Sequence, residues 1–393
     1  MAGRRLNIEH LITKLELGGA QQNTLYCVAH HDRRKYRVSL AAGCGGVLDA
    51  EARRIPDARV HWFPSLHREI RPADDLAFVL RYRDHLHRED VDILHTHSSK
   101  AGILGRIAAG WAGVPVVIHT VHGWGFNDFQ RAPVRALYVG LERLVAPRTD
   151  LLIAVSRENV DRGLKAGIGR RNQYRVIRSG IEPGEFARAK RGRIAVRRTL
   201  GIPPSANLVI TVGNFKPQKA PLDFVRAAAV VARAVPDAWF LMCGDGELKA
   251  AARELGNKLG IGDRLVIPGW RRDIPDLLHA SDVFALSSLF EGLPRSVLQA
   301  AVAGLPVVAT AVNGTPEAVR DGVTGWLVPA QRPDAMAARL VGLLRSPARA
   351  RRMGRAGAKL IGSEFSIRTM LKQIEHAYAD LAERKHLGTS FGV

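Results

Sequence analysis

The chain has few of the residues that stabilise small secreted proteins or hold structural metals. Its 393 residues include three cysteines, Cys27, Cys44 and Cys243, which are far apart in the sequence and form no CxxC pair. This spacing argues against a disulfide framework and a zinc ribbon, and is typical of a reducing compartment. No stretch approaches the roughly 20 apolar residues of a membrane-spanning helix, and the first residues lack a signal-type apolar run. We therefore expect a cytoplasmic protein.

Aromatic and acidic residues are also scarce. Aromatics make up 6% of the chain, and 37 Asp and Glu residues stand against 58 Lys and Arg residues, a formal net charge of +21. Nucleic-acid-binding proteins usually concentrate such charge beside aromatics or in a recognisable motif, whereas here it is spread over both halves, so we expect no nucleic-acid partner. Peripheral contact with the anionic inner face of the cell membrane stays open, through residues 30–37 and 65–72. The alternative is that the scattered charge serves only solubility.

Short apolar runs alternate with helical patterns along the whole chain. The alternation restarts after an arginine-rich polar stretch near residues 187–198. This arrangement predicts an α/β fold in which parallel sheets and crossover helices form two similar domains. The expected strands are Leu6–Ile12, Val38–Ala42, Val60–Phe63, Ile93–Thr96, Val116–Thr120, Leu151–Val155, Arg175–Ile177, Leu208–Val212, Trp239–Cys243, Leu265–Ile267, Val283–Leu286, Val307–Ala309 and Trp326–Val328.

The segment from Ser287 to Pro329 combines an acidic loop, a helix start and glycine-bearing turns. The strand before it leads through a polar loop containing Glu291 to Pro294, a residue favoured at the first helical position. Unpaired amide groups at such a helix start, with the helix dipole behind them, form an anion site at the carboxyl edge of a sheet. Gln299 lies about two turns into this helix, so its side chain and that of Glu291 could contact one ligand. The segment therefore predicts a ligand site.

The same segment, EGLPRSVLQAAVAGLPVVATAVNGTPEAVRDGVTGWLV, resembles the retaining glycosyltransferases of family 4. Their signature places two Glu residues eight positions apart. In this sequence the first position holds Glu291 and the second holds Gln299. The resemblance implies that Glu291 contacts the donor sugar and that Gln299 stands where a Glu accepts hydrogen bonds from the ribose. An amide oxygen is a weaker acceptor than a carboxylate, so we expect donor binding to persist in weakened form.

The resemblance also implies the GT-B fold, in which two Rossmann-like domains face each other across a cleft. On this basis we expect an acceptor-binding domain at residues 1–190 and a nucleotide-sugar-binding domain at residues 191–365. A C-terminal helix within residues 366–393 is expected to pack back on the first domain. The resemblance implies that no cofactor is needed. The expected donor is a nucleoside-diphosphate sugar, and we expect a UDP-sugar rather than a GDP-sugar.

Loops at other strand ends complete the expected donor side. Lys219 stands just before a helix that begins near Pro221, where its ammonium group could contact a diphosphate. The family that the chain resembles has GR…KG in this loop, with both cations on the diphosphate; here Asn214 replaces the Arg, and Lys216 is the nearest substitute. The expected donor-binding residues are Gly19, Asn214, Lys216, Gly244, Gly292, Leu293, Pro294 and Gln299, and the expected catalytic residues are His122, Glu291 and Lys219.

A motif in the first half points to the acceptor. Residues 92–126, DILHTHSSKAGILGRIAAGWAGVPVVIHTVHGWGF, resemble a subgroup of bacterial family 4 enzymes that build surface polysaccharides, often on polyprenyl-diphosphate acceptors. The resemblance gives His122 the position of a histidine that contacts the transferred sugar and its phosphate. His97 and Lys100 lie at the neighbouring strand end and are the acceptor-side candidates. A structural role as a satisfied, half-buried group stays open for His97, and we assign it to His95.

The sequence shows no recognisable metal site. His95 and His97 alternate on one strand, but no third ligand follows at a typical interval. The pair Asp90 and Asp92 precedes its strand, at the edge of a parallel sheet that lies away from ligands, and we interpret it as surface charge. We therefore expect metal-independent transfer.

The expected reaction moves a sugar to a lipid-linked saccharide acceptor with retention, and the resemblance favours same-face attack over a covalent intermediate. Two alternatives remain. A non-catalytic nucleotide-sugar-binding subunit is favoured by the departures at Asn214 and Gln299. A hydrolysing nucleotide-sugar epimerase would use the same fold without an acceptor.

Overall fold

The computed structural model describes residues 4–388 and divides the chain into two compact units. Unit 1 contains the residues up to Gly180 and those from Ile367 onward, and unit 2 runs from Ile181 to Ser366. We expected the chain to change domain after residue 190. It changes ten residues earlier because α7 (Pro183–Phe186) already packs on helix α12 (Arg295–Val302) of unit 2. The last five residues of the expected C-terminal element, 389–393, lie outside the described residues.

Unit 1 is built on a seven-stranded parallel sheet with the order β3-β2-β1-β4-β5-β6-β7. Each strand begins and ends within two residues of its predicted range, because the buried apolar runs define it. The strands are β1 (Leu6–Lys14), β2 (Tyr36–Gly43), β3 (Ala58–Trp62), β4 (Ile93–His97), β5 (Val116–Val121), β6 (Leu151–Ala154) and β7 (Tyr174–Val176).

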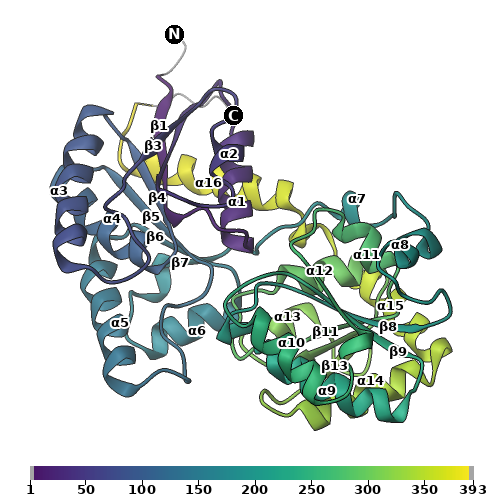
Figure 1. The fold of residues 1–393 in the computed structure, drawn as a ribbon. Coiled ribbons are helices and arrows are strands. Elements are labelled where there is room, and N and C mark those ends of the chain that lie inside the picture. The colour runs from purple at the N-terminus through teal and green to yellow at the C-terminus, as the bar shows by residue number, and fades with distance from the viewer. Residues whose placement is uncertain (1–3, 389–393) are drawn as a thin grey trace. The chain divides into compact units, whose positions relative to one another are not determined.

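Helices cover both faces of this sheet because alternate side chains of each strand point to opposite faces. Ile8 and Ile12 belong to the core that includes helices α1 (Gly19–His30) and α16 (Ile367–Arg384). Leu11, between them, belongs to the core under α3 (Pro72–Arg88) and α4 (Ser99–Ala112). The C-terminal helix α16 thus lies beside α1 and completes unit 1, as the yellow helix next to the purple one in Figure 1 shows.

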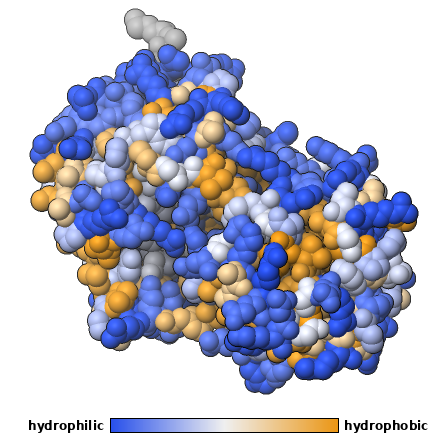
Figure 2. Space-filling view, viewed as in Figure 1, coloured by the Kyte–Doolittle hydropathy of each residue, from blue (hydrophilic) through white to orange (hydrophobic). Residues whose placement is uncertain are grey.

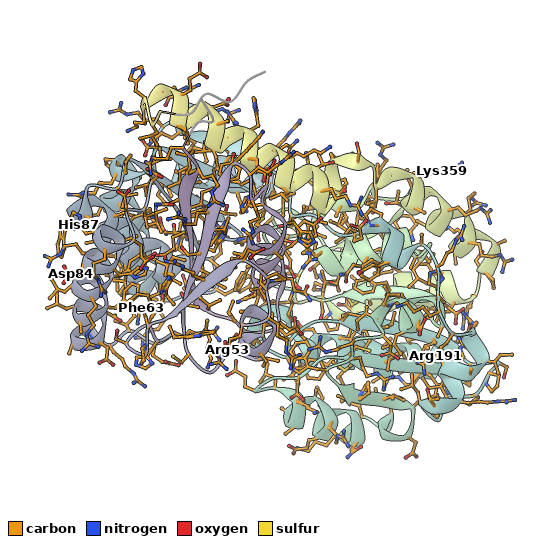
Figure 3. The ribbon with its side chains drawn as sticks, turned by 90° about the horizontal axis from the view of Figure 1, so that it is seen from above. Arg53, Phe63, Asp84, His87, Arg191 and Lys359 are labelled. Atoms are coloured by element: carbon orange, nitrogen blue, oxygen red, sulfur yellow. The ribbon has the colours of Figure 1, made fainter. Side chains whose placement is uncertain are left out.

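Helix α3 illustrates how the polar and apolar residues of unit 1 sort. Its residues Phe78 and Tyr82 are fully buried and pack edge-to-face against the partly buried Phe63, with ring centroids 5.5 and 5.2 Å away. Asp84 and His87 point outward from the same helix (Figure 3). The remaining helices of unit 1 include α2 (Asp49–Ala52), α5 (Ala132–Val145) and α6 (Arg157–Lys165).

Unit 2 is built on a six-stranded parallel sheet with the order β10-β9-β8-β11-β12-β13. Its strands are β8 (Asn207–Val212), β9 (Ala238–Cys243), β10 (Leu265–Gly269), β11 (Val283–Leu286), β12 (Val307–Thr310) and β13 (Gly325–Val328). Its helices are α7, α8 (Arg193–Thr199), α9 (Pro221–Ala234), α10 (Lys249–Lys258), α11 (Ile274–His279), α12 (Arg295–Val302), α13 (Thr315–Ala318), α14 (Pro333–Leu344) and α15 (Pro347–Leu360).

Both sheets have a point at which the strand order reverses. It lies between β1 and β4 in unit 1 and between β8 and β11 in unit 2. In doubly wound sheets, ligands bind outside the carboxyl ends of the strands at this point. The fold therefore directs attention to the loops that follow these four strands. Within residues 4–388, no helix is long and apolar enough to span a membrane.

Candidate active site

Lys219 and Glu291 meet at the strand-order reversal of unit 2. Lys219 ends the short 3-10 turn Pro217–Lys219 (η3) after β8, and Glu291 lies in the loop after β11. The Lys219 Nζ atom is 2.5 Å from Glu291 Oε1. Only 6% of the Glu291 side chain and 19% of the Lys219 side chain are exposed. The structure thus brings together two residues that the sequence separates by 72 positions.

Two residues that we did not single out from the sequence hold Glu291 in place. The Ser288 hydroxyl donates to Glu291 Oε1 at 2.6 Å, and the Glu291 amide donates to the side-chain oxygen of Asn313 at 3.1 Å. Asn313 has φ of +43°, a left-handed conformation that Asn tolerates better than most residues. Ala220, directly after Lys219, also has φ of +43°. Backbone strain at residues that adjoin Lys219 or bond Glu291 is typical of a functional site.

Two polar atoms beside this ion pair are buried without a hydrogen bond to the described residues. They are Oδ1 of Asn214, in the loop after β8, and Oγ1 of Thr315, the first residue of α13. Thr315 is 0% exposed. A buried polar atom without a partner costs about 1–3 kcal/mol, so a native protein keeps one mainly where something else binds. Asn214 was predicted as a donor residue, whereas Thr315 was missed because a threonine at a helix start carries no distinctive signal.

The loop that follows Glu291 is packed tightly into unit 2. Gly292, Leu293 and Pro294 are all buried. We expected Pro294 to be the first helical residue, but α12 begins at Arg295 and Pro294 is its N-cap, because its ψ of 98° is extended. Gln299 is half-buried on α12. It therefore stays a candidate for donor binding.

A close backbone approach joins the loops after β8 and β9. Gly244 has φ of +155°, and a Cβ atom there would lie 1.7 Å from the carbonyl oxygen of Gly213. Only glycine fits, because both the φ angle and the space exclude a side chain. The turn of Gly244 and Gly246 therefore supports the loop that carries Lys216 and Lys219.

In unit 1, histidines end the strands at the corresponding reversal. His97 is the last residue of β4 and is 2% exposed, and His122 directly follows β5. His97 Nδ1 lies 3.1 Å from His122 Nε2. Ser98, after His97, has φ of +62° and bonds Thr13 of β1 through its hydroxyl at 2.8 Å. The two predicted histidines are thus direct neighbours at the edge where a ligand is expected.

A small pocket opens beside these histidines. Its lining includes Asn23 and Thr24 of α1, Thr120 of β5, His122 and Ser179. Asn23 is 2% exposed, and neither its Nδ2 nor its Oδ1 has a hydrogen-bond partner among residues 4–388. An amide of this kind offers a donor and an acceptor to a hydroxyl-rich ligand. Sequence reasoning missed Asn23, since it lies one helical turn after the predicted glycines.

Two other predicted residues occupy the same region. Gly19 is the first residue of α1, and Gly18 is its extended N-cap. Lys100, in the first turn of α4, pairs its ammonium group with the Asp75 carboxylate of α3 at 2.5 Å. This ion pair gives Lys100 a structural task. Its expected contact with an acceptor stays a prediction.

His95 has the structural role that we assigned to it. Its Nδ1 atom bonds the Tyr378 hydroxyl at 2.6 Å and its Nε2 atom bonds the Thr120 hydroxyl at 2.7 Å. Burial lowers the pKa values of His95, His97 and His10 well below the usual range, so these rings are neutral near pH 7. The structure adds His10 of β1 to the pair, and one ring nitrogen of each histidine lies within 4.8 Å of the others. The spacing of histidines in the sequence could not predict this third imidazole, because His10 lies on a different strand from His95 and His97.

Asp92 is not surface charge, in contrast to our interpretation. It is 4% exposed, it accepts the Asn7 amide at 2.8 Å, and it forms an ion pair with Arg4. It therefore ties β4 to the start of β1, at the edge away from the histidines. Asp90, which is 84% exposed, fits the interpretation.

Comparisons with known proteins identify relatives of both units. The family described as "Glycosyl transferases group 1" matches residues 193–360, and the "Glycosyl transferase 4-like domain" matches residues 18–180. The chain is 37% identical over 273 residues to the UDP-Gal:alpha-D-GlcNAc-diphosphoundecaprenol alpha-1,3-galactosyltransferase of Escherichia coli, covering 69% of this chain and 70% of the relative. It is 31% identical over 369 residues to a D-inositol 3-phosphate glycosyltransferase of Mycolicibacterium paratuberculosis, covering 87% and 81%.

Solved structures share the whole fold. The Anabaena protein Alr3699/HepE, in complex with UDP and glucose, has a TM-score of 0.82 at 21% identity, with 96% of this chain and 100% of the other covered. Sucrose-phosphate synthase from Thermosynechococcus elongatus has a TM-score of 0.84 at 21% identity, with 97% and 100% covered. Likeness at this level of identity establishes the fold: α/β, with the two Rossmann-like domains of GT-B glycosyltransferases.

Proposed function

The chain belongs to the GT-B glycosyltransferases of family 4, and from this premise we propose that it transfers a hexose from a UDP-sugar to a polyprenyl-diphosphate-linked saccharide, with retention of configuration. The observation that carries the donor side is the ion pair of the partly exposed Lys219 with the buried Glu291 at the strand-order reversal of unit 2. The Escherichia coli relative, whose name specifies UDP-Gal and a diphosphoundecaprenol-linked acceptor, supports the substrate classes. Cell-surface polysaccharide synthesis is the corresponding role.

The chemistry of unit 2 suits a nucleoside-diphosphate sugar. Lys219 supplies a cation beside the start of α9, whose first amide groups and dipole also favour a diphosphate. Glu291 is a fixed acceptor for sugar hydroxyls, because Ser288 and Asn313 hold its carboxylate and its amide. Asn214 and Thr315 add polar atoms that a bound donor could satisfy.

The chemistry of unit 1 suits hydroxyl-rich groups. His122 is the residue we propose to contact the transferred sugar, and Asn23 and Ser179 line the pocket beside it. His97 contacts His122 directly, so in our proposal it acts on the sugar through that ring. Gly19 and Lys100 remain the other proposed contributors of this unit.

The proposed step is a same-face displacement without a metal ion. The bond between the anomeric carbon and the diphosphate oxygen breaks, the acceptor oxygen forms the new bond to that carbon, and the departing phosphate oxygen takes the acceptor proton. Lys219 and the helix start stabilise the negative charge that develops on the diphosphate; each such contact contributes a few kcal/mol. Gln299 would bond the ribose with a neutral oxygen, which weakens donor binding and leaves the displacement intact.

We further propose that helix α5 of unit 1 brings the protein to an anionic membrane. Val134 and Leu137 are 42% and 50% exposed on this helix, and Leu144 is 57% exposed. Figure 2 shows apolar side chains among the hydrophilic ones over the region labelled α5 in Figure 1. Arg135 and Arg143 are exposed on the same helix, whose sole acidic residue, Glu142, is buried against Arg106.

A helix with exposed apolar and basic residues and no exposed acid of its own is typical of helices that lie on anionic lipid, although Arg135 is paired with Asp128 in the loop before it. Of the two segments that we first considered, residues 30–37 are less suitable because His31 and Tyr36 are buried in the core. Residues 65–72, where Ile70 is 58% exposed, stay a second candidate for membrane contact. A peripheral position at the inner face of the cell membrane would place the enzyme beside a lipid-linked acceptor.

One assay tests the proposed function. Purified protein is incubated with a panel of UDP- and GDP-sugars, with and without an undecaprenyl-diphosphate-linked saccharide, in the presence of EDTA. Released nucleoside diphosphate and glycosylated lipid are measured, and the anomeric configuration of the product is read by NMR. We expect release that depends on a UDP-sugar, on the acceptor, and on intact Lys219.

The alternatives give different results in the same assay. Acceptor-free conversion of the UDP-sugar would identify an epimerase. Donor binding without turnover, measured by calorimetry, would identify a non-catalytic binding subunit. An inverted product, or release that EDTA abolishes, would refute retention or metal independence while leaving the family assignment intact.

A further inference from the structure

Four imidazoles and one carboxylate of unit 1 form a continuous chain of hydrogen-bond contacts. It starts at His122 after β5 and passes His97 of β4, His10 of β1 and His31 after α1, and it ends at Glu375 of α16. The successive distances are 3.1, 3.0, 3.0 and 3.0 Å. His10, His97 and His31 are at most 3% exposed. The chain crosses the unit from the candidate active site to a side chain that is 23% exposed.

The carboxylate at the end of the chain determines the direction of each hydrogen bond. An ionised carboxylate only accepts, and Glu375 Oε1 receives both the Asp32 amide at 3.1 Å and Nδ1 of His31. Burial lowers the pKa of His31, and lowers the pKa values of His10 and His97 further, so each of these rings carries a single N–H hydrogen near pH 7.

A ring that donates through one nitrogen must then accept through the other. His31 donates through Nδ1 and accepts at Nε2 from His10 Nε2. His10 accepts at Nδ1 from His97 Nε2, and His97 accepts at Nδ1 from His122 Nε2. The hydrogen of His122 is thereby assigned to Nε2.

We infer that Glu375, acting through His31, His10 and His97, is a positioning residue for His122: it fixes the Nε2–H tautomer and provides a path by which a proton accepted at Nδ1 can leave. This inference rests on the proposed role of His122 in sugar transfer. It assigns a function to Glu375, His31 and His10, three residues that the transfer chemistry does not otherwise use. It also explains why polar rings occupy the centre of a sheet, where aliphatic side chains are usual.

The proton balance of the path is simple. A proton that binds Nδ1 of His122 releases the hydrogen on Nε2 to Nδ1 of His97. The same exchange repeats through His10 and His31, and Glu375 Oε1 gains the last hydrogen, which it can return to water. Each ring changes tautomer, one proton crosses, and no electron is transferred. In each sugar transfer the departing phosphate oxygen takes one proton from the acceptor hydroxyl, and a phosphate gives up such a proton near neutral pH, so the diphosphate is the source of the proton that binds Nδ1 of His122.

Other ionisable groups pack against the four histidines and Glu375 without interrupting the hydrogen bonds between them. His95 uses both ring nitrogens on Tyr378 and Thr120, so it lies beside the path. Burial raises the pKa of the Cys27 thiol to about 12 and raises the pKa values of the nearby phenols, which keeps them neutral. Ionisable groups face these histidines from α1 and the loop after it, β2, β4, β5 and α16. They are Cys27, His30, Arg33, Tyr36, His95, His119 and Tyr378.

A metal ion is the competing explanation for this cluster. His10, His95 and His97 could each turn one nitrogen to an ion. However, every one of their nitrogens already has a hydrogen-bond partner, and His10 and His97 would have to leave the chain to become ligands. The experiment described next therefore distinguishes a metal site from a hydrogen-bonded proton path.

The test reads the tautomers directly and does not need turnover. The full chain is labelled with 15N-histidine and treated with EDTA, and imidazole nitrogen shifts are recorded for the wild type, Glu375→Gln and Asp380→Asn. Asp380 is the matched control because it also lies on α16 but pairs with Arg175, which is not part of the hydrogen-bonded series from His122 to Glu375. We expect one tautomer at each of the four rings in the wild type and in the control, with hydrogen on Nε2 of His122. In Glu375→Gln, whose amide can donate or accept, we expect both tautomers at His122.

A second readout uses the reaction. The acid limb of the kcat profile should move about one pH unit lower in Glu375→Gln, since the carboxylate no longer stabilises a proton in the chain. Asp380→Asn should keep the wild-type profile, and Glu375→Asp should restore part of the shift.

Each outcome bears on the inference. A mixture of tautomers, or hydrogen on Nδ1, at His122 of the wild type would overturn it even if the Gln variant failed to fold. Unchanged spectra in a folded Glu375→Gln protein, or one equivalent of metal retained before EDTA treatment and bound to His10, would do the same. Absence of transferase activity with every donor would count against the proposed function, while the tautomer measurement would still decide the inference.

Discussion

Lys219 and Glu291 neutralise each other at the carboxyl edge of the unit 2 sheet, with 2.5 Å between Nζ and Oε1. In the function we propose, a diphosphate that binds at this edge draws the ammonium group toward itself, and the carboxylate then turns to the sugar. On this proposal, the ion pair holds each side chain in place until the donor binds.

Replacing either partner should reduce transfer strongly. We expect Lys219→Ala and Glu291→Ala each to lower kcat/KM by roughly 10²-fold, because each removes a contact that stabilises the departing diphosphate or the sugar. The double variant should lose little more than the single ones, since the residues act as a unit. Lys258→Ala, which removes an exposed lysine paired with Glu254, is the control and should retain wild-type kinetics. Near-normal rates in both single variants would show that the site lies elsewhere.

Removing the unpartnered hydroxyl of Thr315 should stabilise the protein and weaken donor binding. Thr315→Val removes a buried polar atom without a partner, so we expect the free energy of unfolding to rise by about 1 kcal/mol. The melting temperature should rise by about 2–4 °C, while the KM for the donor increases. Thr310→Val is the matched control, because the Thr310 hydroxyl donates to the Ser288 carbonyl at 2.6 Å and its loss should destabilise the protein. A donor KM unchanged in Thr315→Val would remove Thr315 from the site.

Restoring the second acid of the family pattern should tighten donor binding. Gln299→Glu places a carboxylate on α12, and hydrogen bonds to charged acceptors exceed neutral ones by about 1 kcal/mol. We expect the dissociation constant of UDP, measured by calorimetry, to fall about fivefold. Gln331→Glu introduces the same charge at an exposed position and should leave binding unchanged. Weaker binding in Gln299→Glu would indicate that this position contacts an anionic part of the donor.

The buried histidines should make the stability of unit 1 sensitive to mild acid. Burial lowers the pKa values of His10, His95, His97 and His119 well below 6.5 in the folded chain, whereas the unfolded chain takes up protons near pH 6.5. The unfolded state therefore binds more protons below pH 6.5, and each such histidine removes up to about 1.4 kcal/mol per pH unit. Above pH 7.5 both states are neutral at these rings, and the contribution disappears.

Urea unfolding between pH 8 and pH 5 measures this dependence. We expect a plateau above pH 7 and a steep loss of stability below pH 6.5. His95→Gln should reduce the slope by about one proton, and His376→Gln, at a side chain that is 74% exposed, should not change it. A flat profile down to pH 5 would mean that these rings are accessible to protons in the folded chain.

The sequence predicted the strands and the order of the site loops, because buried parallel strands are short apolar runs and ligand loops follow them. It placed Glu291 and Lys219 at neighbouring strand ends, and the ion pair agrees with that placement. It could not reveal the histidine chain, since His31 and Glu375 are 344 positions apart and meet only because α16 returns to unit 1. It misread Asp92, because nothing in the local pattern shows that Arg4 and Asn7 would bury it.

The membrane proposal makes a prediction that depends on one helix. If α5 lies on anionic lipid, Leu137→Glu should reduce binding to vesicles that contain phosphatidylglycerol at least tenfold, because it places a charge among exposed apolar side chains and opposes the surface potential. Vesicle sedimentation at low ionic strength measures the bound fraction. Ile194→Glu is the control, since Ile194 is 53% exposed on α8 of unit 2. Equal losses of vesicle binding in both variants would show that the overall positive charge attracts the protein, without a specific surface. Vesicle binding that survives Leu137→Glu would exclude α5 as the membrane-binding surface.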